Sequence, residues 1–171
     1  MAAKNQSWGV IKSILSKETK ADIIKLVSEL YSLSKSNSDF LSARYVLSPD
    51  TIDRYKKEIK KYLGPDEPWK KNTQISLSSA KKVLSDYKKA TNDEFSVIAL
   101  MIYYVEVGND FTCEYGDMYE QYYISLESVF DQAIALTKKH DEKMVYHFIE
   151  RLYFIVRKAN GLGWGYYDAL L

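Results

Sequence analysis

The sequence predicts an all-helical fold in one domain, and three observations support this. Seven glycines and three prolines are few for 171 residues, whereas a β-sandwich or barrel needs many turns built from these residues. The 46% hydrophobic content is ample for a core. Apolar residues recur at spacings of three and four, which outweighs the strand preference of the fifteen tyrosines. We expect seven to eight helices.

The first predicted helices cover residues 19–33 and 40–47. In the first of them the apolar spacing is carried by Ile23, Ile24, Val27, Leu30 and Tyr31. The second should end before Pro49, because proline disfavours helical backbone in the residue before it. Ser48 then becomes the N-cap of a third helix, with Pro49 at its first position.

The third helix should end at Gly64–Pro65. Its predicted buried residues are Ile52, Tyr55, Ile59, Tyr62 and Leu63. Residues 64–76 then form the one long internal loop that we predict. Ser76 or Ser78 is expected to cap the next helix, which buries Ala80, Val83, Leu84 and Tyr87.

The helix that begins at Asn92 or Asp93 is apolar on nearly every side, so it should be the central element. We expect Gly108–Asn109–Asp110 to end it. A helix after Gly116, another after His140–Asp141 and a short one in the C-terminal tail complete the prediction. The predicted common core comprises Ile98, Met101, Ile102, Val105, Val129, Phe148 and Leu152.

Three helix starts, near residues 93, 117 and 141, lie about 24 residues apart. Two helices therefore span about 48 residues, which resembles the unit length of HEAT-type helical repeats. No residue signature repeats with that period. The sequence therefore leaves two architectures open: an αα-hairpin stack (a HEAT-like solenoid) and an irregular helical bundle.

Cysteine and hydropathy patterns point to the cytoplasm. The one cysteine, Cys113, excludes an internal disulfide and fits a reducing compartment. The first fifteen residues contain no apolar run long enough for a signal peptide, and no window reaches the ~18 apolar residues of a membrane span. We expect a cytoplasmic protein with no membrane partner.

The charge is strongly asymmetric along the chain. Residues 1–90, the basic half, carry 18 Lys or Arg against 10 Asp or Glu, and residues 91–171, the acidic half, carry 6 against 13. The halves therefore have net charges of +8 and −7 within a total of +1. Such asymmetry favours anionic partners for one half and cationic partners for the other.

The acidic half supplies the leading functional hypothesis, a non-enzymatic protein-interaction module. Tyrosine gives a large contact area at low entropy cost, and interleaved acids select a basic partner. The partner would be another basic protein, a basic tail or the chain's own basic half, and self-association is one form of such binding. The alternative is that these tyrosines pack in the core with their hydroxyls at its edge. The candidate residues are Glu106, Glu114, Tyr115, Asp117, Tyr119, Glu120 and Tyr123.

The basic half supplies a second hypothesis, nucleic-acid association. Two predicted helices carry the candidate phosphate contacts, and Lys70 and Lys71 lie in the loop between them. Because the cations are lysines rather than arginines, sequence-specific reading of bases would be weak. The simpler alternative is a solvated face. The candidates are Lys56, Lys57, Lys60, Lys61, Lys81, Lys82, Lys88 and Lys89.

Catalytic patterns are weak, so an enzyme is the less favoured class. His147 and Glu150 lie three residues apart on one helix, and Glu106 and Glu120 lie on helices expected nearby. Di-metal carboxylate proteins instead carry paired Glu-x-x-His motifs. We expect no metal site and no cofactor. Gly161, Gly163 and Gly165 lack the spacing of a phosphate-binding loop.

Two segments resemble a bacterial family of short all-helical proteins of unknown function. They are SARYVLSPDTIDRYKKEIKKYLGP (residues 42–65) and IYYVEVGNDFTCEYGDMYEQYY (residues 102–123). The shared features are helix breaks and a lysine-rich helix. The resemblance implies an all-α fold and carries no activity.

Overall fold

A computed structural model describes residues 7–46, 48–68, 70 and 73–171. These residues form nine helices and no strand, so the predicted all-α class is confirmed. Eight helices are longer than one turn and the ninth has four residues. The bounds are α1 Trp8–Leu15, α2 Lys20–Leu33, α3 Lys35–Tyr45, α4 Pro49–Leu63, α5 Leu77–Ala90, α6 Glu94–Tyr115, α7 Glu120–Thr137, α8 Glu142–Lys158 and α9 Tyr166–Ala169.

Most predicted helix boundaries are confirmed by N-cap residues. Ser48 is the N-cap of α4 with Pro49 next to it, and the Ser76 side chain accepts a hydrogen bond from the Ser79 N–H at the start of α5. The Asp93 carboxylate does the same for the Ser96 N–H at the start of α6. Such bonds satisfy donors that have no partner inside the helix. The short helix predicted over 40–47 is α3, and Leu47 lies outside the described residues.

The sequence prediction was wrong at Gly108–Asn109–Asp110, which lie inside α6. The helix continues to Tyr115 and ends at Gly116, whose φ of +96° suits a glycine. A Cβ at Gly108 would meet Leu126 Cδ2 at 2.3 Å, so this glycine permits close approach of α7. Asn109 is fully buried; its Nδ2 donates to Ile155 O and its Oδ1 accepts from Tyr166 Oη.

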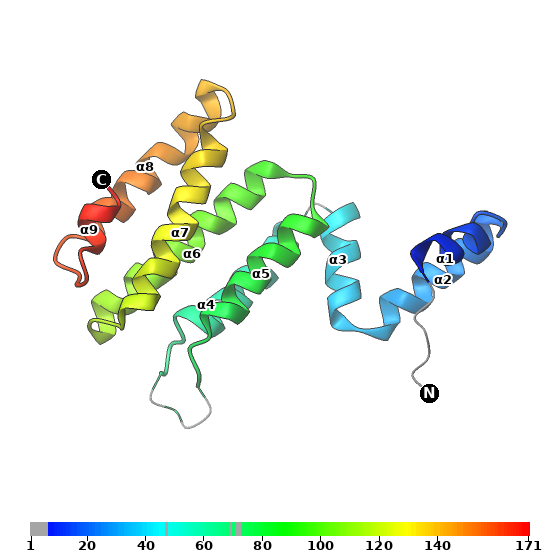
Figure 1. Cartoon of the computed structure of the whole chain (residues 1–171), viewed down its shortest axis with the longest axis horizontal. Coiled ribbons are helices and arrows are strands. Elements are labelled where there is room, and N and C mark those ends of the chain that lie inside the picture. The colour runs from blue at the N-terminus through cyan, green and yellow to red at the C-terminus, as the bar shows by residue number, and fades with distance from the viewer. Residues whose placement is uncertain (1–6, 47, 69, 71–72) are drawn as a thin grey trace.

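Helix α6 is the centre of the molecule, as the sequence predicted. It packs against α4 and α5 on one side and α7 and α8 on the other (Figure 1). The predicted core residues Ile98, Met101, Ile102, Val105, Val129 and Phe148 are buried there. Leu152 packs against this core but is only partly buried.

The N-terminal helices lie at the opposite end of the molecule from α8 (Figure 1). Helix α1 was not predicted, whereas α2 matches the prediction for residues 19–33. Helix α2 packs against α3, which in turn contacts α4 and α5. Neither α1 nor α2 contains a buried residue. Among the described residues, no helix combines the length and the apolar character needed to cross a membrane.

Candidate interaction surfaces

Two of the acids in the acidic half are paired with cations of α8. Glu106 forms a bidentate ion pair with Arg151, whose Nε and Nη2 lie 2.8 and 2.6 Å from the two carboxylate oxygens. Asp110, one helical turn further along α6, pairs with Lys158. Bidentate geometry fixes both side chains. Glu106 therefore holds α8 against α6, and the prediction that it faces a partner is not supported by its position.

Asp117 and Tyr123 form a second internal network. Tyr123 is 2% exposed, and its hydroxyl donates to Asp117 Oδ1 at 2.7 Å. The Gly163 N–H donates to the same oxygen. Both hydrogen bonds lower the pKa of Asp117 below its ordinary value, with the Tyr123 bond the larger cause. This network ties the C-terminal loop to the start of α7, where Trp164 Nε1 also donates to Met118 O.

The other candidates, Glu114, Tyr115, Tyr119 and Glu120, are exposed where α6 ends and α7 begins. Tyr119 is 50% exposed, and the Tyr115 hydroxyl donates to the Asp66 carbonyl at 2.8 Å. Glu106, Asp117 and Tyr123 are thus engaged by partners within the chain, although Asp117 itself is exposed, and the other four candidates form an exposed group.

A pocket of about 210 Å³ lies beside the exposed group, between the end of α4 and the C-terminal half of α6. Three carboxylates line it, from Asp66, Asp110 and Glu114, together with the rings of Tyr103 and Tyr115. The loop residues Gly64 and Pro65, the α6 residues Val107 and Phe111, and one cation, Lys60, complete the lining.

The charges in this pocket are partly compensated. Lys60 Nζ lies 2.5 Å from Asp66 Oδ1, and this hydrogen bond raises the pKa of Lys60 above its ordinary value. Burial raises the pKa of Tyr103, so the ring carries a neutral hydroxyl at neutral pH. Among the described residues Glu114 forms no ion pair. Asp66 and Asp110 are paired with Lys60 and Lys158, so the pocket combines aromatic walls with one carboxylate, Glu114, that has no ion-pair partner among the described residues.

The candidate lysines of the basic half fall into two groups. Lys56, Lys60 and Lys82 pair with Asp53, Asp66 and Asp86, and the ammonium of Lys61 lies 5.1 Å from the centre of the Tyr62 ring. The remaining four, Lys57, Lys81, Lys88 and Lys89, form no ion pair with any described residue. Lys71 lies outside the described residues.

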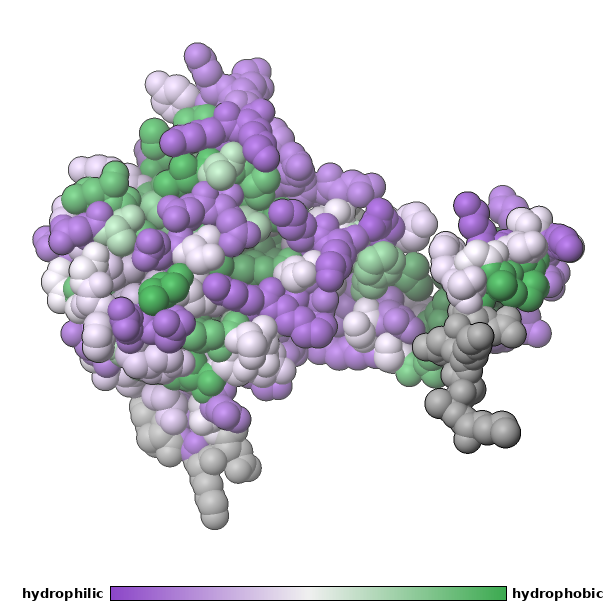
Figure 2. Space-filling model, in the orientation of Figure 1, coloured by the Kyte–Doolittle hydropathy of each residue, from purple (hydrophilic) through white to green (hydrophobic). Residues whose placement is uncertain are grey.

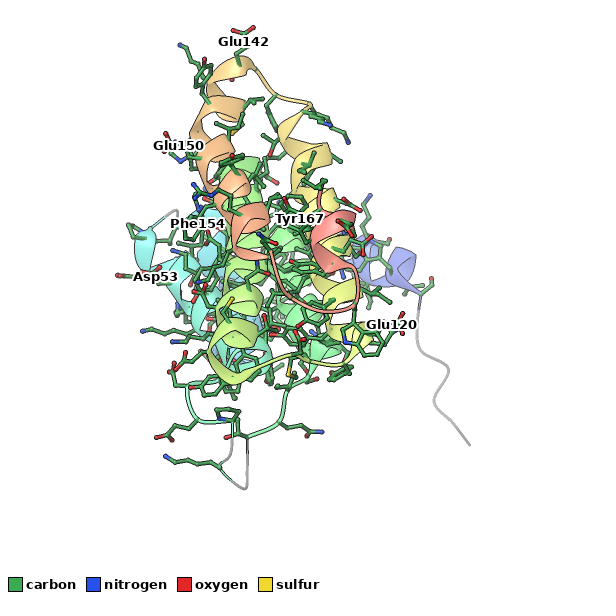
Figure 3. The ribbon with its side chains drawn as sticks, turned by 90° about the vertical axis from the view of Figure 1, so that its left-hand side faces the viewer. Asp53, Glu120, Glu142, Glu150, Phe154 and Tyr167 are labelled. Carbon is green, nitrogen blue, oxygen red and sulfur yellow. The ribbon has the colours of Figure 1, made fainter. Side chains whose placement is uncertain are left out.

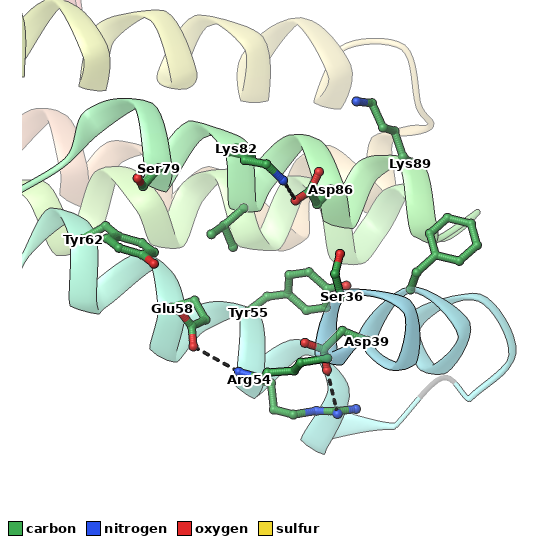
Figure 4. Close-up of a pocket in the computed structure, with 13 residues that line it drawn as sticks. Ser36, Asp39, Arg54, Tyr55, Glu58, Tyr62, Ser79, Lys82, Asp86 and Lys89 are labelled. Carbon is green, nitrogen blue, oxygen red and sulfur yellow. Dashed lines mark hydrogen bonds and ion pairs between the residues drawn. The ribbon is translucent and has the colours of Figure 1, made fainter. Parts of the chain in front are cut away.

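A larger pocket of about 420 Å³ lies between α3, α4 and α5 (Figure 4). Two ion pairs join α3 to α4 at its walls, Lys35 with Glu58 and Arg54 with Asp39, and Lys82 pairs with Asp86 along α5. Tyr55 points into the space between them and packs its ring edge-on against Tyr87. Burial, helped by the nearby carboxylates of Asp39 and Asp86, raises the pKa of Tyr55 to about 12. This mixed charge does not resemble a phosphate-binding surface.

The histidine and glutamates considered for metal chemistry do not converge. His147 packs against Phe95, with ring centres 4.7 Å apart. Glu106 is bound to Arg151, and Figure 3 places Glu120 near the start of α7, well away from Glu150 on α8. In the part of the chain that the structure describes, no three His, Cys, Asp or Glu side chains are placed to hold a metal ion.

Sequence reasoning did not identify the exposed apolar side chains of α1 and α2. Figure 2 shows a hydrophobic patch at the α1–α2 end of the molecule, surrounded by hydrophilic residues. Trp8, Ile14 and Ile24 are 67%, 56% and 59% exposed. The apolar spacing of residues 19–33 was visible in the sequence, but nothing in it distinguished a face that packs inward from one that stays exposed.

No family model, no curated protein and no solved structure matches this chain. The bacterial family suggested by residues 42–65 and 102–123 is therefore not shown to be its family.

Proposed function

We propose that this protein is a non-enzymatic interaction module that binds a basic segment of another protein. The binding surface is the acidic ridge, defined as Glu114, Tyr115, Tyr119 and Glu120 with the 210 Å³ pocket beside them. The observation that carries the proposal is this pocket, where three carboxylates and two tyrosine rings surround a space of side-chain size.

A lysine or arginine side chain is the chemical group that fits such a pocket. Carboxylates attract its charge, and tyrosine faces attract a cation through their negative π surface. Exposed tyrosines around the pocket add contact area at low entropy cost. The ion pair of Glu106 with Arg151, and that of the pocket residue Asp110 with Lys158, hold α6 and α8 together, so the surface is presented by a rigid element.

A lysine-rich peptide titrated into the full chain tests this proposal. Glu114→Gln should weaken binding by roughly 2–5-fold, because a partly exposed charge pair contributes about 0.5–1 kcal/mol. Glu150→Gln on α8 removes an exposed acid far from the ridge and is the matched control. Equal affinity in wild type and Glu114→Gln, or an equal loss in the control, would contradict a specific site.

Nucleic-acid association is the second candidate, favoured by the four lysines that form no ion pair. If Lys57, Lys81, Lys88 and Lys89 contact phosphates, affinity should fall steeply with salt through counterion release. Reversing all four to glutamate should abolish retardation of a short duplex in a gel. Reversal of Lys138 and Lys139 at the end of α7 is the control. No retardation of wild type at low salt removes this candidate.

A further inference from the structure

The pocket of about 420 Å³ between α3, α4 and α5 lies outside the acidic ridge and has the size of a ligand site. Small-molecule pockets in proteins span roughly 300–1,000 Å³, with apolar walls and a few polar groups that orient the ligand. Here Phe40, Tyr62 and Val83 supply aromatic and aliphatic surface. All the lining side chains come from the three helices and none from a loop, so the cavity is built on rigid elements.

Tyr55 places a neutral hydroxyl in this pocket. The residue is 8% exposed, and its ring points into the space between the helices (Figure 4). With a pKa of about 12, the hydroxyl keeps its proton at neutral pH. It forms no hydrogen bond with another described residue. A hydroxyl largely removed from water is stabilised by a hydrogen-bond partner, so a polar ligand atom would gain a contact that the chain itself leaves open.

Charges of both signs line the pocket and are nearly balanced. A phosphate dianion would meet three carboxylates and a polyamine would meet four cations, and like charges at close range oppose binding. A ligand that carries one charge of each sign avoids this conflict. The charged lining residues are Lys35, Arg54, Lys82 and Lys89, with Asp39, Glu58 and Asp86.

The charges are arranged so that an ammonium and a carboxylate each find an opposite partner. Asp39 from α3 and Asp86 from α5 both act on the Tyr55 hydroxyl through their negative charge. Asp39 is bonded to Arg54 through Oδ1, and Asp86 is bonded to Lys82 through Oδ2. No described residue donates to the second oxygen of either carboxylate, so both can accept from a ligand. Lys82 and Asp86 lie one turn apart on α5 and complement the carboxylate and ammonium of an amino acid.

We propose that this pocket binds a free amino acid, a zwitterion, with a large apolar or aromatic side chain. Its ammonium lies between Asp39 and Asp86 and donates to the Tyr55 oxygen. Its carboxylate lies against Lys82, and its side chain packs along the ring of Tyr62. The site shares no residue with the acidic ridge or the 210 Å³ pocket, so it is independent of the proposed function.

Isothermal titration calorimetry of the full chain with L-phenylalanine tests the class of ligand. Phenethylamine lacks the carboxylate, hydrocinnamate lacks the ammonium and glycine lacks the side chain. Each should bind about tenfold more weakly than L-phenylalanine, because each loses one of the three kinds of contact. No binding of L-phenylalanine or L-leucine at millimolar concentration, or equal affinity for one of these three analogues, would overturn the proposal.

Substitutions in the pocket test its location. Asp86→Asn should weaken L-phenylalanine binding by about tenfold without weakening hydrocinnamate, whereas Lys82→Gln should weaken both. Tyr55→Phe should also weaken L-phenylalanine and keep the fold, because the hydroxyl it removes has no hydrogen-bond partner among the described residues. Lys88→Gln, on the same helix but outside the pocket, is the matched control. Unchanged affinity in the three pocket variants, or an equal loss in the control, would contradict binding at this site.

Discussion

Gly108 sets the distance between α6 and α7. A Cβ there would lie 2.3 and 2.8 Å from the two Cδ atoms of Leu126, which is itself fully buried and has little room to move. Glycine inside a helix normally costs about 1 kcal/mol relative to alanine. The close contact reverses that preference, since overpacking a core costs about 1–3 kcal/mol.

Gly108→Ala should therefore lower the free energy of unfolding by about 1 kcal/mol or more in urea denaturation. Gly9→Ala in α1 is the matched control, because a Cβ there would meet only Ser7 Oγ, at 3.7 Å. That substitution should be neutral or slightly stabilising. If Gly108→Ala behaves like Gly9→Ala, the two helices are not in close contact.

Asp117 makes the anchoring of the C-terminal loop dependent on pH. Hydrogen bonds from Tyr123 and Gly163 lower its folded pKa below the ordinary 3.8. A depressed carboxyl pKa gives stability that is complete above the ordinary value and is lost as pH falls through the folded value. Trp164, which donates to Met118 O beside this network, should report the loss as a fluorescence change below about pH 4.

Asp117→Asn should remove this acid transition, because the amide oxygen still accepts hydrogen bonds but carries no charge to protonate. Glu120→Gln is the control, since it removes an exposed acid close by in sequence. A Trp164 transition that is unchanged in Asp117→Asn would show that another group controls the loop.

At the scale of elements, α8 is held in place by the side chains that it packs against α6. Phe148 is fully buried against α6, whereas Leu152, which the sequence placed in the same core, is only partly buried. Phe148→Ala should cost about 3–5 kcal/mol of unfolding free energy, and Leu152→Ala should fall near or below the low end of the 2–5 kcal/mol range for such truncations. Chemical denaturation measures both. A larger loss at Leu152 would mean that the helix is rotated relative to this arrangement.

Helix type and most helix starts could be predicted from the sequence, because they depend on local features. The spacing of apolar residues and the caps at Ser48, Ser76 and Asp93 all act within one or two turns. The end of α6 at Gly116 could not be predicted in this way. Gly108 and Asn109 are typical of helix ends, but here tertiary contacts with Leu126, Ile155 and Tyr166 hold them inside the helix.

The candidate surface was predicted only in part, and the reason is again tertiary. The density of acids and tyrosines located the acidic ridge, but it could not separate the exposed Glu114 from Glu106, whose partner Arg151 is 45 residues away in the chain. The same limit applies to α2. Its apolar spacing predicted a helix, and whether that face is covered depends on contacts that no local pattern encodes.

At the scale of the whole molecule, the charge asymmetry persists in the folded chain. No ion pair among the described residues joins the basic half to the acidic half; each pairs residues of one half. The halves do meet through a cation–π contact of Lys56 with Tyr103 and around the pocket that Lys60 shares with Asp110 and Glu114. The net charges of +8 and −7 are therefore still available to other molecules.

Light scattering at low and high ionic strength should show whether opposite halves of different molecules associate. Such contacts should weaken as salt rises, because screening limits exposed charges to about 8 Å at physiological ionic strength. Association that is independent of salt, or a monomer at every ionic strength, would contradict a role for the charge asymmetry.

The order of helix contacts also bears on how the chain folds during synthesis. The main helix–helix contacts join helices that are adjacent in the chain or separated by one helix. Such contacts close short loops, so the chain loses less conformational entropy before the packing contacts form. This favours rapid folding. Helices α4 and α5 can therefore pack while α6 is still emerging from the ribosome, and each later helix finds its neighbours already in place.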